Sequence, residues 1–372
     1  MKRIATITFH ASYNYGSNLQ AYALQEYIKK ISNGNCEYKI INLRTDKQKE
    51  MYKTFFEKKG VLNQIKSNMF FYYKKTLLRK KELFENFINN KLNITKEYKS
   101  LEDLKNEDLK YDYYIAGSDQ LWNIRSKDFD WSNFLEFASN GKKISYAASF
   151  GPKKLELLPA EKERIKEDLL KFDEISVREQ GSFESVKNIV NINSEINIDP
   201  TMLLNKLDWE KLDESNSPIY RKGKYIFLYN LKGKEYQKLA RKISKELRLP
   251  IIISNYRSVK EINFGVKKVY DVGPIEFLNL IRNAEIVLSS SFHGTIFSIL
   301  LNKPFFALNG KEDLRINTLL KKMGLEERSV NFSDYESKCK NAFNINFELA
   351  EQKLNEERKK SEKYLKRVLD IE

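Results

Sequence analysis

The chain has 372 residues, 41% of them hydrophobic, and a formal net charge of +15 at pH 7. This length predicts two or three domains, because a single core rarely grows beyond about 250–300 residues, and the apolar content argues against general disorder. No apolar run approaches the roughly 20 residues of a membrane-spanning helix, and we expect no signal peptide. The cysteines, Cys36 and Cys339, have no CxxC partner, so we expect neither a disulfide framework nor a thiolate zinc site. These features favour a cytoplasmic location.

The first elements alternate strand, loop, helix and strand. Residues 2–9 form an apolar run that predicts a buried strand, followed by the loop HASYNYGSN. Apolar residues at helical spacing over 19–31 then predict a helix, and CEYKIINL at 36–43 predicts a second strand. This order is typical of a doubly wound α/β domain.

A basic segment follows, which we interpret as a helical insert over about 47–99. It contains 14 Lys or Arg residues against 5 Asp or Glu, and a run of aromatic residues, Phe70, Phe71, Tyr72 and Tyr73. Such a segment suits an anionic membrane surface or a nucleic acid. It also suits a helix whose lysines are solvated and whose aromatic rings pack on the core. These three interpretations stay open on the sequence alone.

The rest of the chain again alternates predicted strands with polar loops. Apolar runs lead into polar loops in YDYYIAGSDQLW (111–122), KISYAASFG (143–151) and FDEISVRE (172–179). We predict a first Rossmann-like domain over 1–212, a polar linker at 213–223, and a second such domain over 213–345. In the second domain we expect strands at 224–229, 250–254 and 285–289, and helices at 234–247, 277–283 and 295–301. A terminal helix occupies 346–372, and the two domains are predicted to face a cleft.

The most informative strand-end loop is SSSFHGT, residues 289–295. Gly294 allows close approach of a backbone, Thr295 can cap the following helix, and a helix start offers N–H groups to a phosphate or carboxylate. His293 beside such an anion would donate a proton, unless it is a buried histidine satisfied by a backbone carbonyl. Arg178 similarly suits a carboxylate or phosphate, or a salt bridge near Glu179.

Six motifs, taken in order, resemble those of the polysaccharide pyruvyl transferase family. They are TFHASYNYGSNLQAYALQ (8–25), YDYYIAGSDQLWN (111–123), ISYAASFG (144–151), ISVREQGS (175–182), IDPTMLL (198–204) and NAEIVLSSSFHGTIFSILLNKPF (283–305). The resemblance implies an α/β fold of two Rossmann-like domains, similar to glycosyltransferases of the GT-B type. It also implies transfer of pyruvate from phosphoenolpyruvate to two hydroxyls of a sugar, forming a ketal during surface or exopolysaccharide (capsule) synthesis. We expect no cofactor besides this co-substrate, and no metal site.

The resemblance places the donor at His293, the expected acid or phosphate contact, and at Arg178, the expected holder of phosphoenolpyruvate. The full donor-binding set predicted is Arg178, Ser290, Ser291, His293, Gly294 and Thr295. The chain departs from the family pattern at Ser291, where an arginine is expected. One cation of the donor site is therefore missing, or it is supplied by another residue such as Lys311 or Arg315. This departure keeps a second function open, a GT-B-type glycosyltransferase that uses a nucleotide sugar.

The first domain is the expected host of the sugar acceptor. Asp119 is the first candidate for the general base, with Glu179 second, although Asp119 also suits a helix N-cap. Trp122 is either a sugar-stacking platform or a core residue. The acceptor-binding residues predicted are His10, Asn14, Tyr15, Gly16, Asn18, Gln120 and Trp122.

The expected partners are phosphoenolpyruvate and a sugar acceptor on a lipid carrier. We therefore expect peripheral contact with the anionic inner membrane face, through Lys74, Lys75, Arg79, Lys80 and Lys81 and the aromatic run before them. A nucleic-acid binder driven by the +15 charge is the third function considered, and it does not account for the polar strand-end loops. No nucleic-acid partner is expected.

Overall fold

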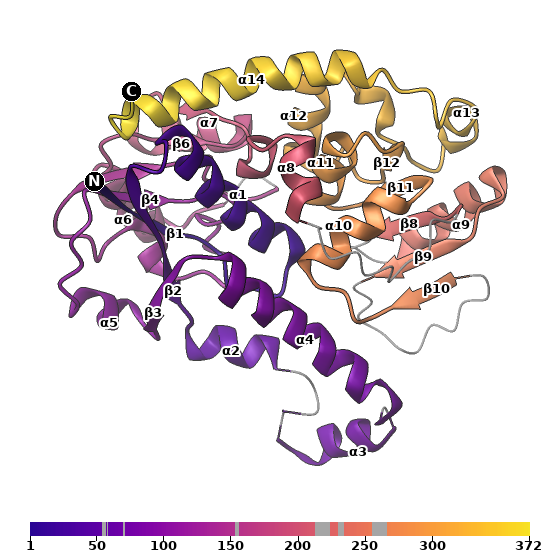
Figure 1. The fold of residues 1–372 in the computed structure, drawn as a ribbon, viewed down its shortest axis with the longest axis horizontal. Helices are drawn as coiled ribbons and strands as arrows, with labels where there is room; N and C mark the ends of the chain where they lie inside the picture. Colours follow the sequence, from indigo (N-terminus) through magenta and orange to yellow (C-terminus); the bar gives the residue numbers. More distant parts are fainter. Residues whose placement is uncertain are drawn as a thin grey trace. The chain divides into compact units, whose positions relative to one another are not determined.

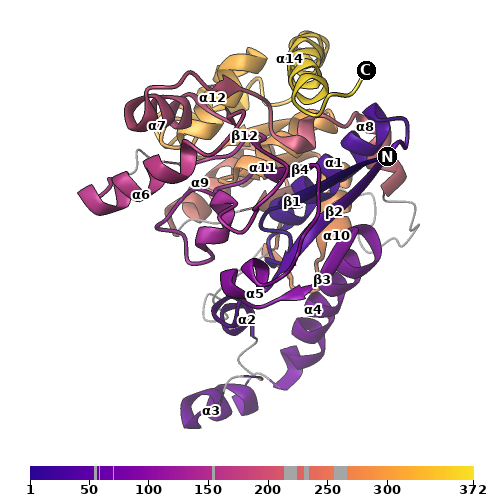
Figure 2. The ribbon, with the colours of Figure 1, turned by 90° about the vertical axis from the view of Figure 1, so that its left-hand side faces the viewer.

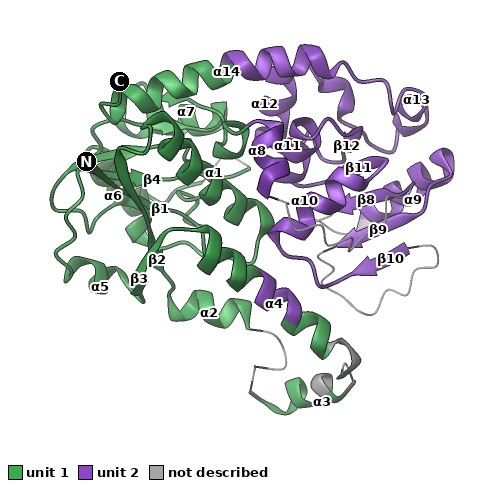
Figure 3. Ribbon diagram, viewed as in Figure 1, with its two compact units in different colours: residues 1–78, 84–204, 357–372 green, residues 79–83, 205–356 purple. Residues whose placement is uncertain are grey.

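A computed structural model describes residues 1–53, 57, 59–69, 71–152, 156–212, 224–229, 234–254 and 266–372. The chain divides into two compact units (Figure 3). Unit 1 comprises residues 1–78, 84–204 and 357–372, and unit 2 comprises residues 79–83 and 205–356. The division falls after Leu204, whereas the sequence places it at 212, and the predicted linker at 213–223 lies outside the described residues. The predicted terminal helix is α14 (Phe347–Val368), whose residues are shared between the two units.

Unit 1 is built on a five-stranded parallel sheet with the order β3-β2-β1-β4-β5 (Figure 1). The strands are β1 (Lys2–Ile7), β2 (Cys36–Leu43), β3 (Ile94–Tyr98), β4 (Tyr113–Ala116) and β5 (Lys142–Ser145). All of β4 and the last four residues of β1 are buried, as expected for parallel strands covered on both faces. A short parallel pair, β6 (Ser176–Val177) and β7 (Glu195–Ile196), lies beside the segment that follows β5, where Ala148 forms a bridge with Val177.

The predicted basic insert is the crossover between β2 and β3. It contains α2 (Asp46–Tyr52), α3 (Val61–Met69) and α4 (Phe71–Lys91). The prediction of a helical segment up to residue 99 is wrong at its end, because Ile94–Tyr98 forms strand β3 and pairs with β2. The second half of α4 belongs to the core, since Phe84, Phe87 and Ile88 are buried. A basic surface and a buried face therefore share one helix.

Unit 2 repeats the same topology. Its parallel sheet has the order β10-β9-β8-β11-β12, with β8 (Ile226–Tyr229), β9 (Ile251–Ser254), β10 (Val266–Val269), β11 (Ile286–Ser289) and β12 (Phe305–Ala307). Numbered along the chain within each unit, both sheets have the order 3-2-1-4-5 of a Rossmann-like domain. The strand order therefore reverses between β1 and β4 in unit 1, and between β8 and β11 in unit 2. Ligands of such sheets bind at these points, beyond the carboxyl ends of the strands.

The remaining elements connect and cover the sheets. In unit 1 they are α1 (Tyr15–Ile31), α5 (Leu101–Lys105), η1 (Trp131–Phe134), α6 (Pro159–Leu169), α7 (Gln180–Val190) and η2 (Pro200–Met202). In unit 2 they are α8 (Lys206–Leu212), α9 (Lys234–Leu247), α10 (Pro274–Asn283), α11 (Phe292–Leu300), α12 (Leu314–Met323), η3 (Glu326–Arg328) and α13 (Tyr335–Cys339). Within the described ranges, no helix has the length and hydrophobicity needed to cross a bilayer.

Candidate functional site

Two loops of unit 1 meet where its strand order reverses. Ser17 lies in the first turn of α1, which follows β1, and Asp119 lies in the loop after β4. The Ser17 hydroxyl donates a hydrogen bond of 2.6 Å to Oδ2 of Asp119. Because this edge of a doubly wound sheet is where ligands bind, the pair marks the candidate site of unit 1.

Arg178 joins the same site from the end of β6. Its Nη1 donates a hydrogen bond of 2.7 Å to Oδ2 of Asp199. Its Nε lies 3.4 Å from Oε2 of Glu179, and its Nη2 lies 3.9 Å from Oδ1 of Asp119. Burial by itself lowers the pKa of Arg178, but the three carboxylates, Asp199 foremost, offset this effect and raise the pKa overall. The guanidinium therefore stays charged although it is buried.

The carboxylates around Arg178 are held by further hydrogen bonds. Oε1 of Glu179 accepts a hydrogen bond of 2.7 Å from the Ser149 hydroxyl and a second from the Ser182 hydroxyl. Oδ1 of Asp199 accepts from the backbone N–H and the hydroxyl of Thr201, at 3.0 and 2.7 Å. Such a network of buried polar groups fixes the strand-end loops of unit 1 in one arrangement.

Asp119 has a strained backbone. Its φ of 77° is in the left-handed region, where residues other than glycine are uncommon. It forms an isolated bridge with Ala148, and the described residues 120–130 form turns and no helix. The alternative that Asp119 caps a helix is therefore wrong. Backbone strain of this kind is often found at functional sites, which fits a functional role for Asp119. The role of Asp119 as the general base stays a prediction.

His10, predicted to bind the acceptor, is buried inside unit 1. Its Nδ1 lies 3.1 Å from the carbonyl of Thr8 and its Nε2 lies 3.0 Å from Oδ1 of Asn42. Desolvation by burial lowers its pKa, against the opposing effect of these hydrogen bonds. Both ring nitrogens already have protein partners, so the structure gives His10 a role in holding the loop after β1.

Trp122 belongs to the core of unit 1, which decides between the two alternatives left open by the sequence. Its ring stacks on Phe134 with the centroids 5.6 Å apart, and its Nε1 donates to the carbonyl of Asn133 at 3.3 Å. The ring is fully buried. A sugar-stacking role for Trp122 is therefore wrong.

The other predicted acceptor residues mostly build the loop between β1 and α1. Asn14 caps α1 by accepting a hydrogen bond of 3.0 Å from the N–H of Gly16. Asn18 donates to the carbonyls of His10 and Ser12, and the buried Tyr15 ring stacks on Phe84. Within the predicted acceptor set, Asn14 is exposed and Gln120 is half-buried, so these two remain accessible to a ligand.

In unit 2 the loop SSSFHGT lies at the carboxyl end of β11. Ser291, in an extended conformation, is the N-cap residue of α11, and its carbonyl accepts hydrogen bonds from the N–H and the hydroxyl of Thr295, both 3.1 Å. The helix thus begins at Phe292, three residues before the predicted start, and the prediction that Thr295 caps it is wrong. The Ser289 hydroxyl contacts the N–H and the carbonyl of Ser291, both at 3.0 Å, which turns the chain directly after the strand.

Close packing at this turn explains the glycine. A Cβ atom at Gly294 would collide with the Ser289 hydroxyl and would lie 2.9 Å from Cδ1 of Tyr229, at the end of β8. His293, the second residue of α11, is 7% exposed. The start of α11 is therefore held directly against the ends of β8 and β11, with His293 in its first turn.

Arg315 lies close to this helix start. Its Nη2 and Nε donate to the two carboxylate oxygens of Asp313 at 2.8 and 3.0 Å. Its guanidinium carbon lies 5.6 Å from the centre of the Phe292 ring. Phe292 is the residue between Ser291 and His293 in the sequence. Lys311, the other cation considered for the place left by Ser291, is exposed. Of these two cations, Arg315 is the one that the structure shows beside the start of α11.

Asn309 follows β12, the strand next to β11. The N–H of Leu308 donates to the carbonyl of Ser289 at 2.8 Å, which places Asn309 beside the start of the SSSFHGT loop. Asn309 is buried, and among the described residues neither its amide nitrogen nor its oxygen has a hydrogen-bond partner. Buried amides are almost always hydrogen-bonded, so Asn309 is a candidate contact for a ligand or a water molecule at this loop.

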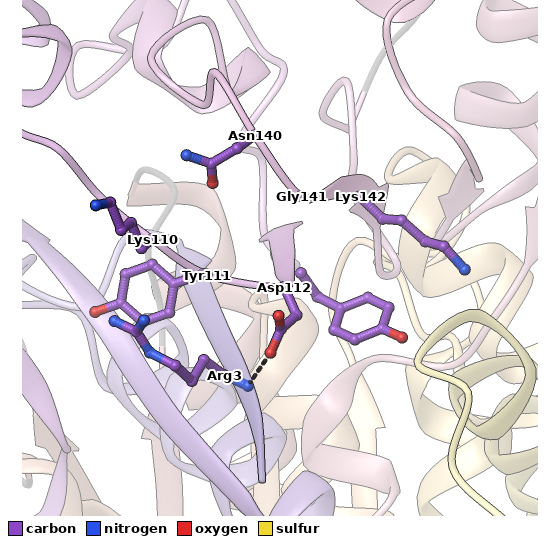
Figure 4. Close-up of a pocket in the computed structure, with 8 residues that line it drawn as sticks. Arg3, Lys110, Tyr111, Asp112, Asn140, Gly141 and Lys142 are labelled. Atoms are coloured by element: carbon purple, nitrogen blue, oxygen red, sulfur yellow. Dashed lines mark hydrogen bonds between the residues drawn. The ribbon is translucent and has the colours of Figure 1, made fainter.

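A hollow of about 410 Å³ lies at the opposite edge of the unit 1 sheet, at the amino ends of β1, β4 and β5 (Figure 4). Its lining includes Arg3, Lys110 and Lys142. Each of these cations has a carboxylate within 4 Å, from Glu37, Asp108 and Asp370 respectively. The hollow thus lies at the other end of the strands from the candidate site, and its cations are already neutralised.

Sequence reasoning missed Asp199, Ser17 and Asn309 as site residues. Asp199 and Ser17 stand inside quoted motifs, where an acid before proline and a serine at a helix start were available signals. Asn309 lies outside every motif, and only its burial without a partner marks it. In the part of the chain that the structure describes, no group of three or more His, Cys, Asp or Glu side chains fits a metal ion.

Comparison with solved structures defines the fold class. The UDP-N-acetylglucosamine 2-epimerase from Neisseria meningitidis, bound to UDP-GlcNAc, matches with a TM-score of 0.55 and 14% identity over 98% of this chain and 100% of that one. The enzyme of the same name from Methanocaldococcus jannaschii, in complex with UDP-GlcNAc and UDP, matches with a TM-score of 0.54 and 16% identity over 100% and 99%. This likeness shows the fold, a GT-B-like pairing of two Rossmann-like domains.

The chain belongs to the polysaccharide pyruvyl transferase family, whose sequence model matches residues 14–312. The match covers most of the chain and includes the loops around Asp119, Arg178 and His293. No curated protein gives a significant match to the sequence.

Proposed function

We propose that this protein transfers pyruvate from phosphoenolpyruvate to two hydroxyls of a sugar, forming a cyclic ketal in the synthesis of a surface polysaccharide. Family membership supports a transferase of this kind. The observation that carries the proposal is the buried side-chain amide of Asn309, close to the SSSFHGT loop and without a hydrogen-bond partner in the described part of the chain. An anion at the start of α11 would meet the N–H groups of the first turn and the positive end of the helix dipole, with the Asn309 amide and Arg315 close by.

In this proposal unit 2 binds the donor. The helix start, the Asn309 amide and the Arg315 guanidinium hold the phosphate and carboxylate of phosphoenolpyruvate. Arg315 then replaces the arginine that the family pattern has at Ser291. Arg178 remains a proposed donor contact, although its pairing with Asp199, Glu179 and Asp119 gives it an additional role in fixing the loops of unit 1.

The reaction proposed consists of two additions at carbon 2. His293 donates a proton to carbon 3 of the enol, which makes carbon 2 electrophilic. A sugar hydroxyl bonds to carbon 2 and loses its proton to Asp119, the proposed base of the acceptor side in unit 1. Inorganic phosphate then leaves with the electrons of its C–O bond. The second hydroxyl bonds to carbon 2 and loses its proton to His293, which closes the ketal and restores the acid, while Asp119 releases its proton to the departing phosphate.

The proposal is tested by the thermal shift of the purified protein with phosphoenolpyruvate, beside a panel of nucleotide sugars. We expect phosphoenolpyruvate to raise the melting temperature, and the His293→Ala variant to lose that rise. The exposed residue Asn188 on α7 provides a control, because Asn188→Ala leaves both candidate sites intact. Stabilisation by a nucleotide sugar and not by phosphoenolpyruvate would overturn the proposal in favour of a glycosyltransferase.

The sugar acceptor is proposed to be carried on a lipid at the cytoplasmic membrane face. Phosphate release with candidate lipid-linked sugars, measured only after the donor is established, tests this part separately. Release with a lipid-linked sugar and not with the free sugar is the result expected.

A further inference from the structure

Exposed apolar side chains gather on α3 and the start of α4. Val61, Leu62 and Ile65 are 73%, 74% and 57% exposed, and Phe71 is 68% exposed. Val61 and Leu62 precede Ile65 by four and three residues, so both lie next to Ile65 on one face of α3. Both views show α3 at the end of α4 that is remote from the sheet of unit 1 (Figures 1 and 2). These side chains therefore do not belong to the core of unit 1.

Cations flank this apolar face. Lys74 and Lys75 are exposed and follow Phe71 by three and four residues, which places them on its side of α4. Between residues 57 and 81 the sequence has eight Lys or Arg residues and one acidic residue, Glu57. From Val61 to Leu78 it has no acidic residue. A protruding segment thus combines exposed aliphatic residues with a local excess of positive charge.

This combination selects one kind of partner. A second copy of the chain would bring two strongly positive surfaces together, which is unfavourable. A nucleic acid would neutralise the lysines but leave Val61, Leu62 and Ile65 in water. An anionic bilayer satisfies both features, because the aliphatic residues enter the interface while the lysines contact the charged headgroups.

We propose that Val61, Leu62, Ile65, Phe71, Lys74 and Lys75 form a docking surface for an anionic lipid bilayer, here called the α3–α4 surface. Lys74, Lys75 and Phe71 are part of the sequence prediction of membrane contact, whereas the apolar face of α3 comes from the structure. Of the other residues in that prediction, Phe70 lies outside the described residues, and Arg79 lies 3.9 Å from Asp271 through its Nε. The docking surface requires no assumption about the reaction catalysed.

The test is co-sedimentation of the full chain with phosphatidylcholine vesicles, with and without phosphatidylglycerol. We expect binding to the anionic vesicles only, weakened by salt because exposed charges are screened. The Lys74→Glu/Lys75→Glu variant should bind the anionic vesicles at least about tenfold more weakly, since each basic residue near an anionic membrane adds to the binding free energy. The Val61→Ser/Leu62→Ser variant should bind more weakly than the native chain even at low salt.

Matched controls keep the experiment decisive. Lys162 on α6 and Lys187 on α7 are exposed residues of unit 1, so Lys162→Glu/Lys187→Glu makes the same change in net charge elsewhere. Leu158, which is exposed, supplies the apolar control Leu158→Ser. Both controls should bind like the native chain. The proposal is overturned if the native chain does not bind anionic vesicles, or if the α3–α4 variants and the controls lose binding equally.

Two further measurements separate the other partners. Dimerisation without vesicles that disappears in Val61→Ser/Leu62→Ser would assign the surface to a second copy and overturn the proposal. The proposal would also be overturned if the native chain bound RNA and not vesicles, and if this salt-sensitive RNA binding were lost in Lys74→Glu/Lys75→Glu. The surface would then be assigned to a nucleic acid. Because vesicle binding is measured without phosphoenolpyruvate, its result is independent of the proposed reaction.

Discussion

Arg178 and Asp199 form a buried ion pair, with Nη1 of the arginine 2.7 Å from Oδ2 of the aspartate. The two residues come from different motifs, ISVREQGS and IDPTMLL, and the pair joins the loop after β6 to the segment before η2. Removing one partner of a buried pair leaves an uncompensated charge in the protein interior. The pair therefore holds the site of unit 1 together.

Asp199→Asn should lower the free energy of unfolding by about 3 kcal/mol, because Arg178 then lacks its nearest carboxylate. Urea denaturation measures this change. Asp108→Asn is the control, since Asp108 pairs with Lys110 on the surface and such pairs contribute about 1 kcal/mol or less. Equal losses in the two variants would mean that the buried pair is not structural.

Asp119→Asn should lower kcat by roughly 10²–10⁴-fold, because an amide cannot accept the proton of a sugar hydroxyl. Asparagine tolerates the left-handed backbone of this position, so we expect the fold to be kept. Phosphate release under saturating phosphoenolpyruvate measures the effect. Asp108→Asn, which changes an exposed carboxylate paired with Lys110, should keep kcat within a few-fold. An unchanged kcat in Asp119→Asn would exclude Asp119 as the base.

Asn309→Leu should act in opposite directions on stability and on binding. Leucine removes a buried amide that has no partner among the described residues, so the free chain should gain about 1–3 kcal/mol of unfolding free energy. The same change should abolish the thermal shift by phosphoenolpyruvate. Melting curves with and without the ligand measure both effects. A variant that is stabilised and still responds to phosphoenolpyruvate would show that the amide does not contact the donor.

Arg315→Gln should raise the KM for phosphoenolpyruvate by about tenfold or more, since a charge-assisted hydrogen bond to the donor is lost. Initial rates over a range of phosphoenolpyruvate concentrations give the value. Arg241→Gln, at an exposed position on α9, is the matched control and should leave KM unchanged. If Arg315→Gln behaves like this control, the cation missing at Ser291 is not supplied by Arg315.

His10 should make the folded chain less stable in mildly acidic solution. Burial lowers the pKa of His10 in the folded state below its ordinary value of 6.5. Below about pH 6.5 the unfolded chain therefore binds a proton that the folded chain does not, and the free energy of unfolding falls as the pH drops. Urea denaturation at pH 5.5 and 7.5 should show a smaller difference for His10→Gln than for the native chain. The same difference in both would contradict this prediction.

The sequence was most reliable where apolar runs are continuous. The predicted strand at 36–43 coincides with β2, and the predicted helix at 234–247 coincides with α9. Boundaries next to polar residues were less accurate. The helix expected from Thr295 begins at Phe292, because two hydrogen bonds between Ser289 and Ser291 turn the chain before any periodic pattern starts. Strand β3 was missed, since a short edge strand beside a long helix has little pattern of its own.

The sequence by itself determined the family and the position of the strand-end loops, because the six motifs and the apolar runs are properties of neighbouring residues. Only the tertiary structure decided which side chains meet and which are accessible. It places Trp122 in the core and gives His10 two internal partners. It also brings Asp119 and Asp199, from distant motifs, to Arg178 beside its neighbour Glu179. It also leaves Val61 and Leu62 in solvent. Burial and long-range contacts depend on how the strands are ordered in each sheet, and local sequence patterns do not contain that order.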